Sequence, residues 1–151
     1  MSRAQVRVQV KRLPGSEDLP LPQYQTVDSA AVDLHAAVDE PVSLHPGDIK
    51  LIPTGLAMAL PPGYEAQVRP RSGLAVKHGL TLPNTPATID ADYRGEIRVP
   101  MINHGKATVT IERGMRIAQM LVAPVPRIVW DVVDELPASS RGAGGFGHTG
   151  D

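Results

Sequence analysis

The stretch NTPATIDADYRGEI, from Asn84 to Ile97, decides how the rest of this chain is interpreted. It carries two acidic residues, Asp90 and Asp92, followed directly by a tyrosine, an arginine and Gly95. Apolar residues then return at every second position, a pattern that is typical of a half-buried strand. The stretch therefore predicts a β-hairpin whose tip holds a carboxylate beside an aromatic ring at fixed geometry. Asp and Gly are also the usual residues of polar turns, so the tip alone does not decide the function.

The composition favours one strand-rich domain. The 151 residues include 14 glycines and 15 prolines, which leave little room for helices. With three tyrosines, one tryptophan and one phenylalanine, the core must be aliphatic, and the absence of cysteine excludes disulfides and thiolate chemistry. Fifteen basic residues against sixteen acidic ones give no basic field for duplex nucleic acid. No run resembles a signal peptide or a membrane span, so we expect a cytoplasmic protein without nucleic-acid or membrane partners.

Alternation and turn residues predict about ten short strands with one short helix. A clear strand signal runs over residues 6–10. Residues 49–51 and 56–60 are predicted as two strands on either side of the turn Pro53-Thr54-Gly55, and residues 128–133 as the last strand of the globular part. A single helical turn is expected after Gly73. The fold class that follows is all-β, a sandwich or jelly roll.

Three polar features outside the central stretch are candidates for ligand binding. Asp33 is a lone carboxylate in a mainly apolar run, either a paired polar group or a ligand. Arg71, Ser72 and Gly73 enter the predicted helical turn, where free N–H groups and an arginine fork can hold a phosphate, although Ser is also a common N-cap. Gln119 lies in an apolar run, so its amide needs a core network or a bound anion as partner.

From residue 137 the chain changes character, which predicts a β domain over 1–136 and a flexible tail over 137–151. The tail, rich in glycine, has too little apolar surface to fold alone. Its Phe146, the only phenylalanine of the chain, lies between glycines, as expected of a strap that orders over a ligand with its ring stacked on a flat partner. Arg141 and the backbone around Thr149 would then bind anionic groups. A disordered solubilising tail is the alternative.

Five stretches of the chain, taken in order, resemble the five motifs of the trimeric deoxyuridine triphosphatases, the dUTPase family. They are SAAVDLHA (29–36), PRSGLA (70–75), TIDADYRGE (88–96), GMRIAQ (114–119) and RGAGGFGHTG (141–150). The resemblance covers essentially the whole chain. It implies a jelly-roll or distorted β-barrel homotrimer with active sites between subunits. Such an enzyme splits dUTP into dUMP and pyrophosphate with Mg²⁺, which limits uracil incorporation into DNA and supplies dUMP for dTMP synthesis.

The resemblance also implies roles for residues of the central stretch. Asp90 would orient and deprotonate the water that attacks the α-phosphorus. Tyr93 would lie against the deoxyribose and leave no room for a 2′-hydroxyl. Asn84, with the backbone at Thr88 and Ile89, would read the edge of the uracil.

Further roles fall on the other four motifs. Phosphate oxygens would be bound by Arg71, Ser72, Gly73 and Gln119. Asp33 would act on Mg²⁺ indirectly, through water. The tail would close over base and γ-phosphate from another subunit, using Arg141, Phe146, Gly147, His148 and Thr149. One carboxylate for the water and several donors for the anion suit phosphoryl transfer, which needs positioning and charge neutralisation more than covalent chemistry.

Four positions depart from the motifs. Ala31 and Ala87 stand where glycine is common, Met115 where an acidic residue is common, and His148 where serine is frequent. Neither Met115 nor His148 removes a group that the chemistry requires. Two other interpretations remain open at this point: a dCTP deaminase, which shares this fold, and a nucleotide-binding regulator that has lost hydrolysis. Ammonia release from dCTP would distinguish the deaminase.

Overall fold

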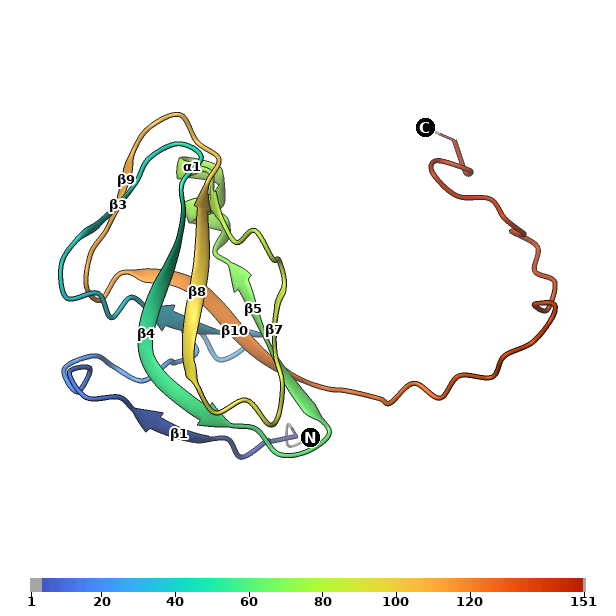
Figure 1. Cartoon of the computed structure of the whole chain (residues 1–151), viewed down its shortest axis with the longest axis horizontal. Coiled ribbons are helices and arrows are strands. Elements are labelled where there is room, and N and C mark those ends of the chain that lie inside the picture. Colours follow the sequence, from blue (N-terminus) through green and yellow to red (C-terminus); the bar gives the residue numbers. More distant parts are fainter. Residues whose placement is uncertain (1–3, 151) are drawn as a thin grey trace.

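The computed structural model describes residues 4–150. Residues 1–3 of the predicted β domain and residue 151 of the predicted tail lie outside this range. Two four-stranded antiparallel sheets form the body, one behind the other in Figure 1. The first sheet has the order β1 (Gln9–Arg12), β4 (Ile49–Ala59), β8 (Glu96–Asn103), β6 (Leu80–Thr81). The second has the order β2 (Val32–His35), β10 (Arg116–Pro124), β5 (Tyr64–Pro70), β7 (Ala87–Ile89). A small sheet pairs β3 (Val42–Leu44) with β9 (Val109–Ile111), and α1 (Ser72–His78) is the helix.

The prediction of an all-β fold with about ten strands and one short helix is confirmed. Side chains from both sheets meet in an aliphatic core. The alternation after the central stretch holds, because Ile97, Val99 and Met101 are 2%, 0% and 1% exposed. Burying an aliphatic side chain of this kind stabilises the fold by about 1.5–3 kcal/mol. Among the described residues, no helix is long and apolar enough to cross a membrane.

A buried amide ties the loops together at one end of the body. Asn103, at the end of β8, is fully buried. Its Nδ2 donates to the carbonyls of Leu44 and Ala107 at 2.9 and 2.8 Å, and its Oδ1 accepts from the Gly105 N–H at 2.8 Å. The next residue, His104, donates its N–H to the carbonyl of Gly79, where α1 ends. Asn103 therefore joins the end of β3 to the loop between β8 and β9, and the neighbouring His104 joins them to the C-terminal end of the helix.

The prediction of two strands over residues 49–60 is wrong, because β4 is continuous. Its register against β8 shifts between Pro53 and Ala57. Two bonds carry the pairing across this irregularity: the Thr54 hydroxyl donates to the carbonyl of Ile97, and the Gly55 N–H donates to Glu96 Oε1 at 3.1 Å. Proline and glycine here make a bulge in one strand and do not end it.

The central stretch is not a paired hairpin, which corrects a second prediction. Strand β7 pairs with β5, whereas β8 pairs with β4 and β6. Residues 90–95 thus carry the chain from an edge of one sheet into the other sheet. The turn itself exists as expected, but its two arms diverge and leave a space between the sheets.

The two ends of the described chain also differ from the expected strands. β1 covers Gln9–Arg12, later than the alternation at 6–10 predicts. The predicted strand at 128–133 is wrong for the single chain: after Val125, whose N–H donates to Gly63, residues 126–150 run away from the body (Figure 1). Within the described part of one chain, this segment has no free strand edge beside it to pair with. We call residues 126–136 the arm and residues 137–150 the tail.

Candidate functional site

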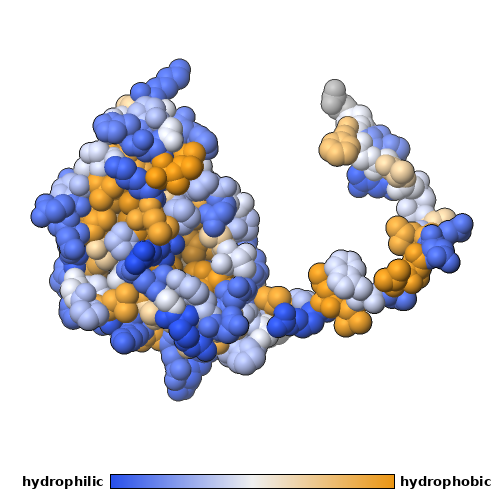
Figure 2. Space-filling model, viewed as in Figure 1, coloured by the Kyte–Doolittle hydropathy of each residue, from blue (hydrophilic) through white to orange (hydrophobic). Residues whose placement is uncertain are grey.

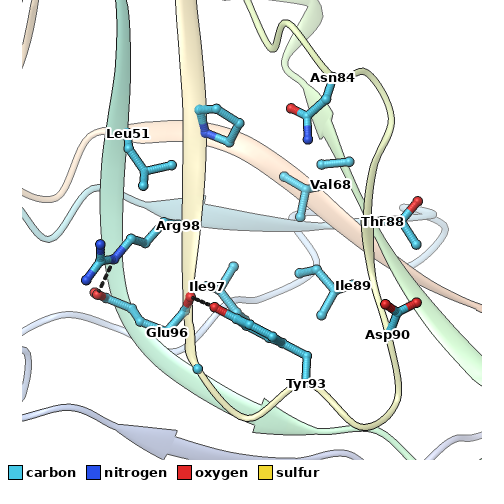
Figure 3. Close-up of a pocket in the computed structure, with 13 residues that line it drawn as sticks. Leu51, Val68, Asn84, Thr88, Ile89, Asp90, Tyr93, Glu96, Ile97 and Arg98 are labelled. Atoms are coloured by element: carbon cyan, nitrogen blue, oxygen red, sulfur yellow. Dashed lines mark hydrogen bonds and ion pairs between the residues drawn. The ribbon is translucent and has the colours of Figure 1, made fainter.

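The space between the diverging strands β7 and β8 is a hollow of about 590 Å³. Figure 3 shows it, with Tyr93 and Asp90 at one end and Asn84 at the other. Its floor is apolar, while polar side chains stand on its rim. The lining residues are Leu51, Val68, Asn84, Ala87, Thr88, Ile89, Asp90, Tyr93, Gly95, Glu96, Ile97, Arg98 and Pro100. A flat, partly apolar ligand with polar edges fits such a lining.

Tyr93 is fixed in its place at the rim. Its hydroxyl donates to the carbonyl of Glu96 at 2.8 Å, and its N–H donates to the carbonyl of Asp90 at 3.2 Å. The ring lies so close to Gly95 that a Cβ there would be 2.5 Å from the phenol oxygen. Glycine is therefore required at position 95 for this ring orientation. Tyr93 as a whole residue is 46% exposed, and its ring is a wall of the hollow outside the core.

Two further side chains make the turn rigid. Arg94 Nη1 donates to the carbonyls of Ala91 and Tyr93 at 2.7 and 3.0 Å. Glu96 accepts from the Gly55 N–H and, at 2.9 Å, from Arg98 Nε. The bulge of β4 is thereby joined to the rim of the hollow. The carboxylate of Asp90 is consequently held on a turn whose backbone has little freedom.

A second cluster forms where β2, β10 and the end of β5 meet. Asp33 is 8% exposed and lies between two arginines. Its Oδ2 accepts from Arg116 Nη1 at 3.1 Å, and its Oδ1 is 3.6 Å from Arg71 Nε. Arg71 Nη1 also donates to the carbonyl of Arg116 at 3.2 Å. Two positive charges surround one carboxylate, which leaves the cluster with a net positive charge suited to an anion.

The remaining residues of the second and fourth motifs lie beside this cluster. Arg71 occupies the N-cap position of α1 and Ser72 is its first residue, so the serine does not cap the helix. Gly73 follows within the helix, with open space at the position that a Cβ would occupy. Gln119 is paired in register with Asp33, and its Nε2 donates to the carbonyl of Pro70 at 2.9 Å. Of the two partners expected for the Gln119 amide, a group of the protein or a bound anion, its nitrogen therefore has the first, the Pro70 carbonyl.

His35 is half-buried, and its Nδ1 is the one buried side-chain nitrogen or oxygen atom without a hydrogen-bond partner among the described residues. Loss of solvent lowers the pKa of His35 below 6.5; the Asp33 carboxylate opposes this, while Arg116 and Arg71 add to it. The imidazole therefore stays neutral beside the arginines near neutral pH.

The fifth motif lies away from both clusters. Its residues, Arg141 and Phe146 to Thr149, belong to the exposed tail (Figure 1). Phe146 is fully exposed and has a positive φ of 50°. The Arg141 Nε donates to the carbonyl of Gly144 at 2.7 Å, a local turn within the tail. In the described part of the single chain, the tail runs free of the body.

The structure thus groups the predicted residues into two clusters and a detached tail. Asn84, Thr88, Ile89, Asp90 and Tyr93 line one hollow. Asp33, Arg71 and Gln119 meet elsewhere and do not line it. Sequence reasoning missed Leu51, Glu96, Arg98 and Arg116. Nothing in the sequence around Leu51 indicates a binding role. Glu96 and Arg98 lie at the end of the central stretch or just after it, and Arg116 lies inside the fourth motif. Their closeness to these motifs is the signal that could have identified them.

Similar proteins support one family. The dUTPase family profile matches residues 17–150. A deoxyuridine 5′-triphosphate nucleotidohydrolase of Maricaulis maris is 60% identical over 147 residues, which is 96% of this chain and 97% of the relative. The enzyme of the same name from Desulfotalea psychrophila is 60% identical over 135 residues, 89% of this chain and 90% of that one.

Solved structures agree on the fold. The dUTPase of Staphylococcus bacteriophage 80alpha with dUpNHpp has a TM-score of 0.84 and 26% identity, covering 96% of this chain and 99% of its own. A mutant dUTPase from phage phi11 of S. aureus, described with a structural Mg(II) ion, has a TM-score of 0.75 and 24% identity over 85% of this chain and 97% of its own; it supports the fold alone.

These findings first define a class: an all-β protein of two antiparallel sheets with an extended C-terminal segment, a hollow behind a carboxylate-and-tyrosine turn, and a separate cationic cluster. Within that class the assignment is narrower. The chain belongs to the dUTPase family.

The lowered pKa of His35 predicts how stability depends on pH. A group whose folded-state pKa is lowered binds its proton more readily when the chain is unfolded. Stability should therefore fall as the pH falls through 6.5, the ordinary value, toward the folded-state pKa. We expect the melting temperature to drop less between about pH 7.5 and about pH 5.5 in His35→Gln than in the unchanged protein. His78→Gln, which alters an exposed histidine of α1, is the control and should keep the original dependence. Equal drops in all three proteins would contradict the prediction.

Proposed function

We propose that this chain hydrolyses dUTP to dUMP and pyrophosphate. The observation that carries the proposal is the hollow that Asp90 and Tyr93 both line from one rigid turn, in a chain 60% identical to enzymes named for this activity. The proposed cellular result is less uracil in DNA and a supply of dUMP for dTMP synthesis.

Asp90 is the proposed general base. Its carboxylate is exposed on the rim, on a turn held by backbone bonds and by Arg94. A carboxylate so placed can accept a proton from a water that attacks the α-phosphorus, which releases pyrophosphate by in-line displacement. Tyr93 supplies a fixed wall against the deoxyribose, and its position over Gly95 supports the exclusion of a 2′-hydroxyl.

The opposite end of the hollow is proposed to bind uracil. Asn84 is exposed there, where its amide can both donate and accept, and the edge strand β7 offers backbone groups at Thr88 and Ile89. The hydrogen-bonding edge of uracil has alternating donors and acceptors that such groups can match. Apolar residues beneath, Val68 and Ile97 among them, are suited to the ring face.

The cationic cluster is proposed to bind the triphosphate. Arg71, Ser72, Gly73 and Gln119 are the residues assigned to phosphate oxygens. No group of three His, Cys, Asp or Glu side chains within residues 4–150 could hold a metal ion by itself. Asp33 alone, already paired with arginines, fits an indirect role toward Mg²⁺ whose other ligands are phosphate oxygens and water. When bound, that ion neutralises charge on the phosphates.

A homotrimer with shared sites is the proposed assembly. The hollow and the cationic cluster do not share one cavity in a single chain. The arm exposes large apolar side chains, and the aliphatic ones are the orange patches along the extended segment in Figure 2. The exposed apolar residues of the arm are Ile128, Val129, Trp130, Val132, Val133 and Leu136. Exposed apolar surface of this extent favours contact with a second copy, and it supports a site built from more than one chain.

The tail is proposed to close over the bound nucleotide from another subunit. Nine residues from Arg141 to Thr149 extend at most about 30 Å. Phe146 would stack on the base, while Arg141, Gly147, His148 and Thr149 would contact the phosphates. Ordering a glycine-rich segment costs conformational entropy, which contacts with the ligand must offset.

The first test replaces the proposed base. Asp90→Asn keeps the side-chain shape but cannot accept the proton, so pyrophosphate release from dUTP should fall by roughly 10²–10⁴-fold. Affinity for dUpNHpp, measured by calorimetry, should stay near that of the unchanged protein. The unchanged protein is assayed alongside with dUTP, UTP, dTTP and dCTP. Near-normal turnover in Asp90→Asn would move the catalytic role to another carboxylate, with Asp92 as the first suspect.

The second test concerns sugar discrimination by the Tyr93 ring. Tyr93→Ala opens the wall beside the sugar, so the ratio of kcat/KM for dUTP to that for UTP should fall, chiefly through lost dUTP activity. Tyr93→Phe keeps the ring and serves as the matched control, with a ratio closer to that of the unchanged protein. A ratio that stays the same in Tyr93→Ala would argue against steric exclusion.

The third test concerns the tail. Truncation after Ser140 should leave folding and assembly intact while catalysis is strongly weakened, since the removed residues lie away from the body. Two inactive proteins, full-length Asp90→Asn and the truncated chain, are then refolded together. If tails act on a neighbouring subunit, some sites combine an intact Asp90 with a tail, and activity returns.

The control for this mixture is the assembly state. Mass spectrometry must show both chains in one oligomer before the result is interpreted. A mixed oligomer without activity would rule out tails that act between subunits, since each tail would then serve only its own chain.

A further inference from the structure

Asp33 is shared between two arginines that come from different parts of the chain. Arg116 belongs to β10, and Arg71 precedes α1. The side chain of Asp33 is only 10% exposed, against 29% for Arg71 and 44% for Arg116. A carboxylate withdrawn from water to this degree requires a cationic partner, because an unpaired buried charge is costly.

The two arginines hold Asp33 unequally. Arg116 makes a direct hydrogen bond of 3.1 Å to Oδ2, whereas Arg71 Nε stays 3.6 Å from Oδ1, beyond a good hydrogen bond. Arg71 uses one nitrogen, Nη1, to donate to the carbonyl of Arg116. The Arg116 side chain therefore supplies the direct hydrogen bond to the Asp33 carboxylate, and the Arg116 carbonyl orients the Arg71 guanidinium.

We infer that Arg116 is a positioning residue that occupies Asp33 and so leaves Arg71 available to the phosphates. This rests on the proposed function, in which Arg71 binds phosphate oxygens. Without Arg116, Asp33 retains one cation within 4 Å among the described residues, namely Arg71. The contact between them would tighten into a charge-assisted hydrogen bond, and a phosphate would then have to displace it.

The competition predicts a specific pattern of binding. Arg116→Ala should weaken the affinity for dUpNHpp by roughly tenfold to a hundredfold, the value of one charge-assisted hydrogen bond. Adding Asp33→Asn to that variant removes the competing carboxylate, so affinity should return to within about threefold of the starting protein. Affinities are measured by calorimetry with dUpNHpp in EDTA. Because EDTA removes Mg²⁺, a role of Asp33 toward that ion does not affect the comparison.

Two controls separate competition from a general loss of positive charge. Lys106→Ala removes an exposed lysine and should leave the affinity unchanged. Arg116→Lys keeps a cation for Asp33 and should bind nearly as the unchanged protein does. If Arg116→Ala does not fold, Arg116→Gln replaces it, because a neutral amide can still contact Asp33 without balancing its charge.

A crystal structure of ligand-free Arg116→Ala or Arg116→Gln provides a direct readout. The distance from Arg71 Nε to Asp33 Oδ1, 3.6 Å in the unchanged chain, should shorten to hydrogen-bond range. An unchanged distance, an unchanged affinity, or a double variant that stays as weak as the single one would each overturn the role of Arg116. Failure of the unchanged protein itself to bind dUpNHpp would instead overturn the proposed function, and this inference with it.

Discussion

The pairing of β10 with β2 on one side and β5 on the other is the constraint on which the cationic cluster depends. Gln119 is opposite Asp33 in one pairing and opposite Arg69 in the other. This register brings the end of β5, and hence Arg71, beside the carboxylate on β2. The bulge between Arg116 and Ala118 turns the Arg116 side chain toward Asp33. A slip of one residue would send these side chains to the opposite face of the sheet and separate the cluster.

The second constraint is the path of residues 90–95 between the two sheets. Because β7 and β8 belong to different sheets, the turn between them bridges an open edge, and the hollow results. Tyr93, Arg94 and Glu96 close this turn through backbone carbonyls, and Gly95 makes room for the ring. The rim of the hollow is therefore preorganised, which reduces the ordering cost when a ligand binds.

The single chain has a complete fold, but its candidate functional residues are not gathered in one place. Its aliphatic core is a single cluster of buried side chains from both large sheets. The hollow, the cationic cluster and the tail nevertheless lie in three places, and the arm exposes apolar side chains that a stable monomer would bury. This division agrees with a proposed assembly in which catalysis depends on association, so that each site contains residues of several subunits.

The sequence by itself determined the all-β class, the aliphatic core, the presence of a helical turn just after Gly73 and the stretches that hold the candidate functional residues, because alternation, turn residues and motif spacing are local properties. Only the tertiary structure decided that β4 continues through Pro53, since bonds from Thr54 and to Gly55 across the sheet replace the interrupted ladder. It also decided that β7 and β8 diverge, that residues 128–133 find no strand edge within the described part of one chain, and that Arg116 holds Asp33. Each of these depends on which distant segments become neighbours, and a local pattern carries no information about that choice.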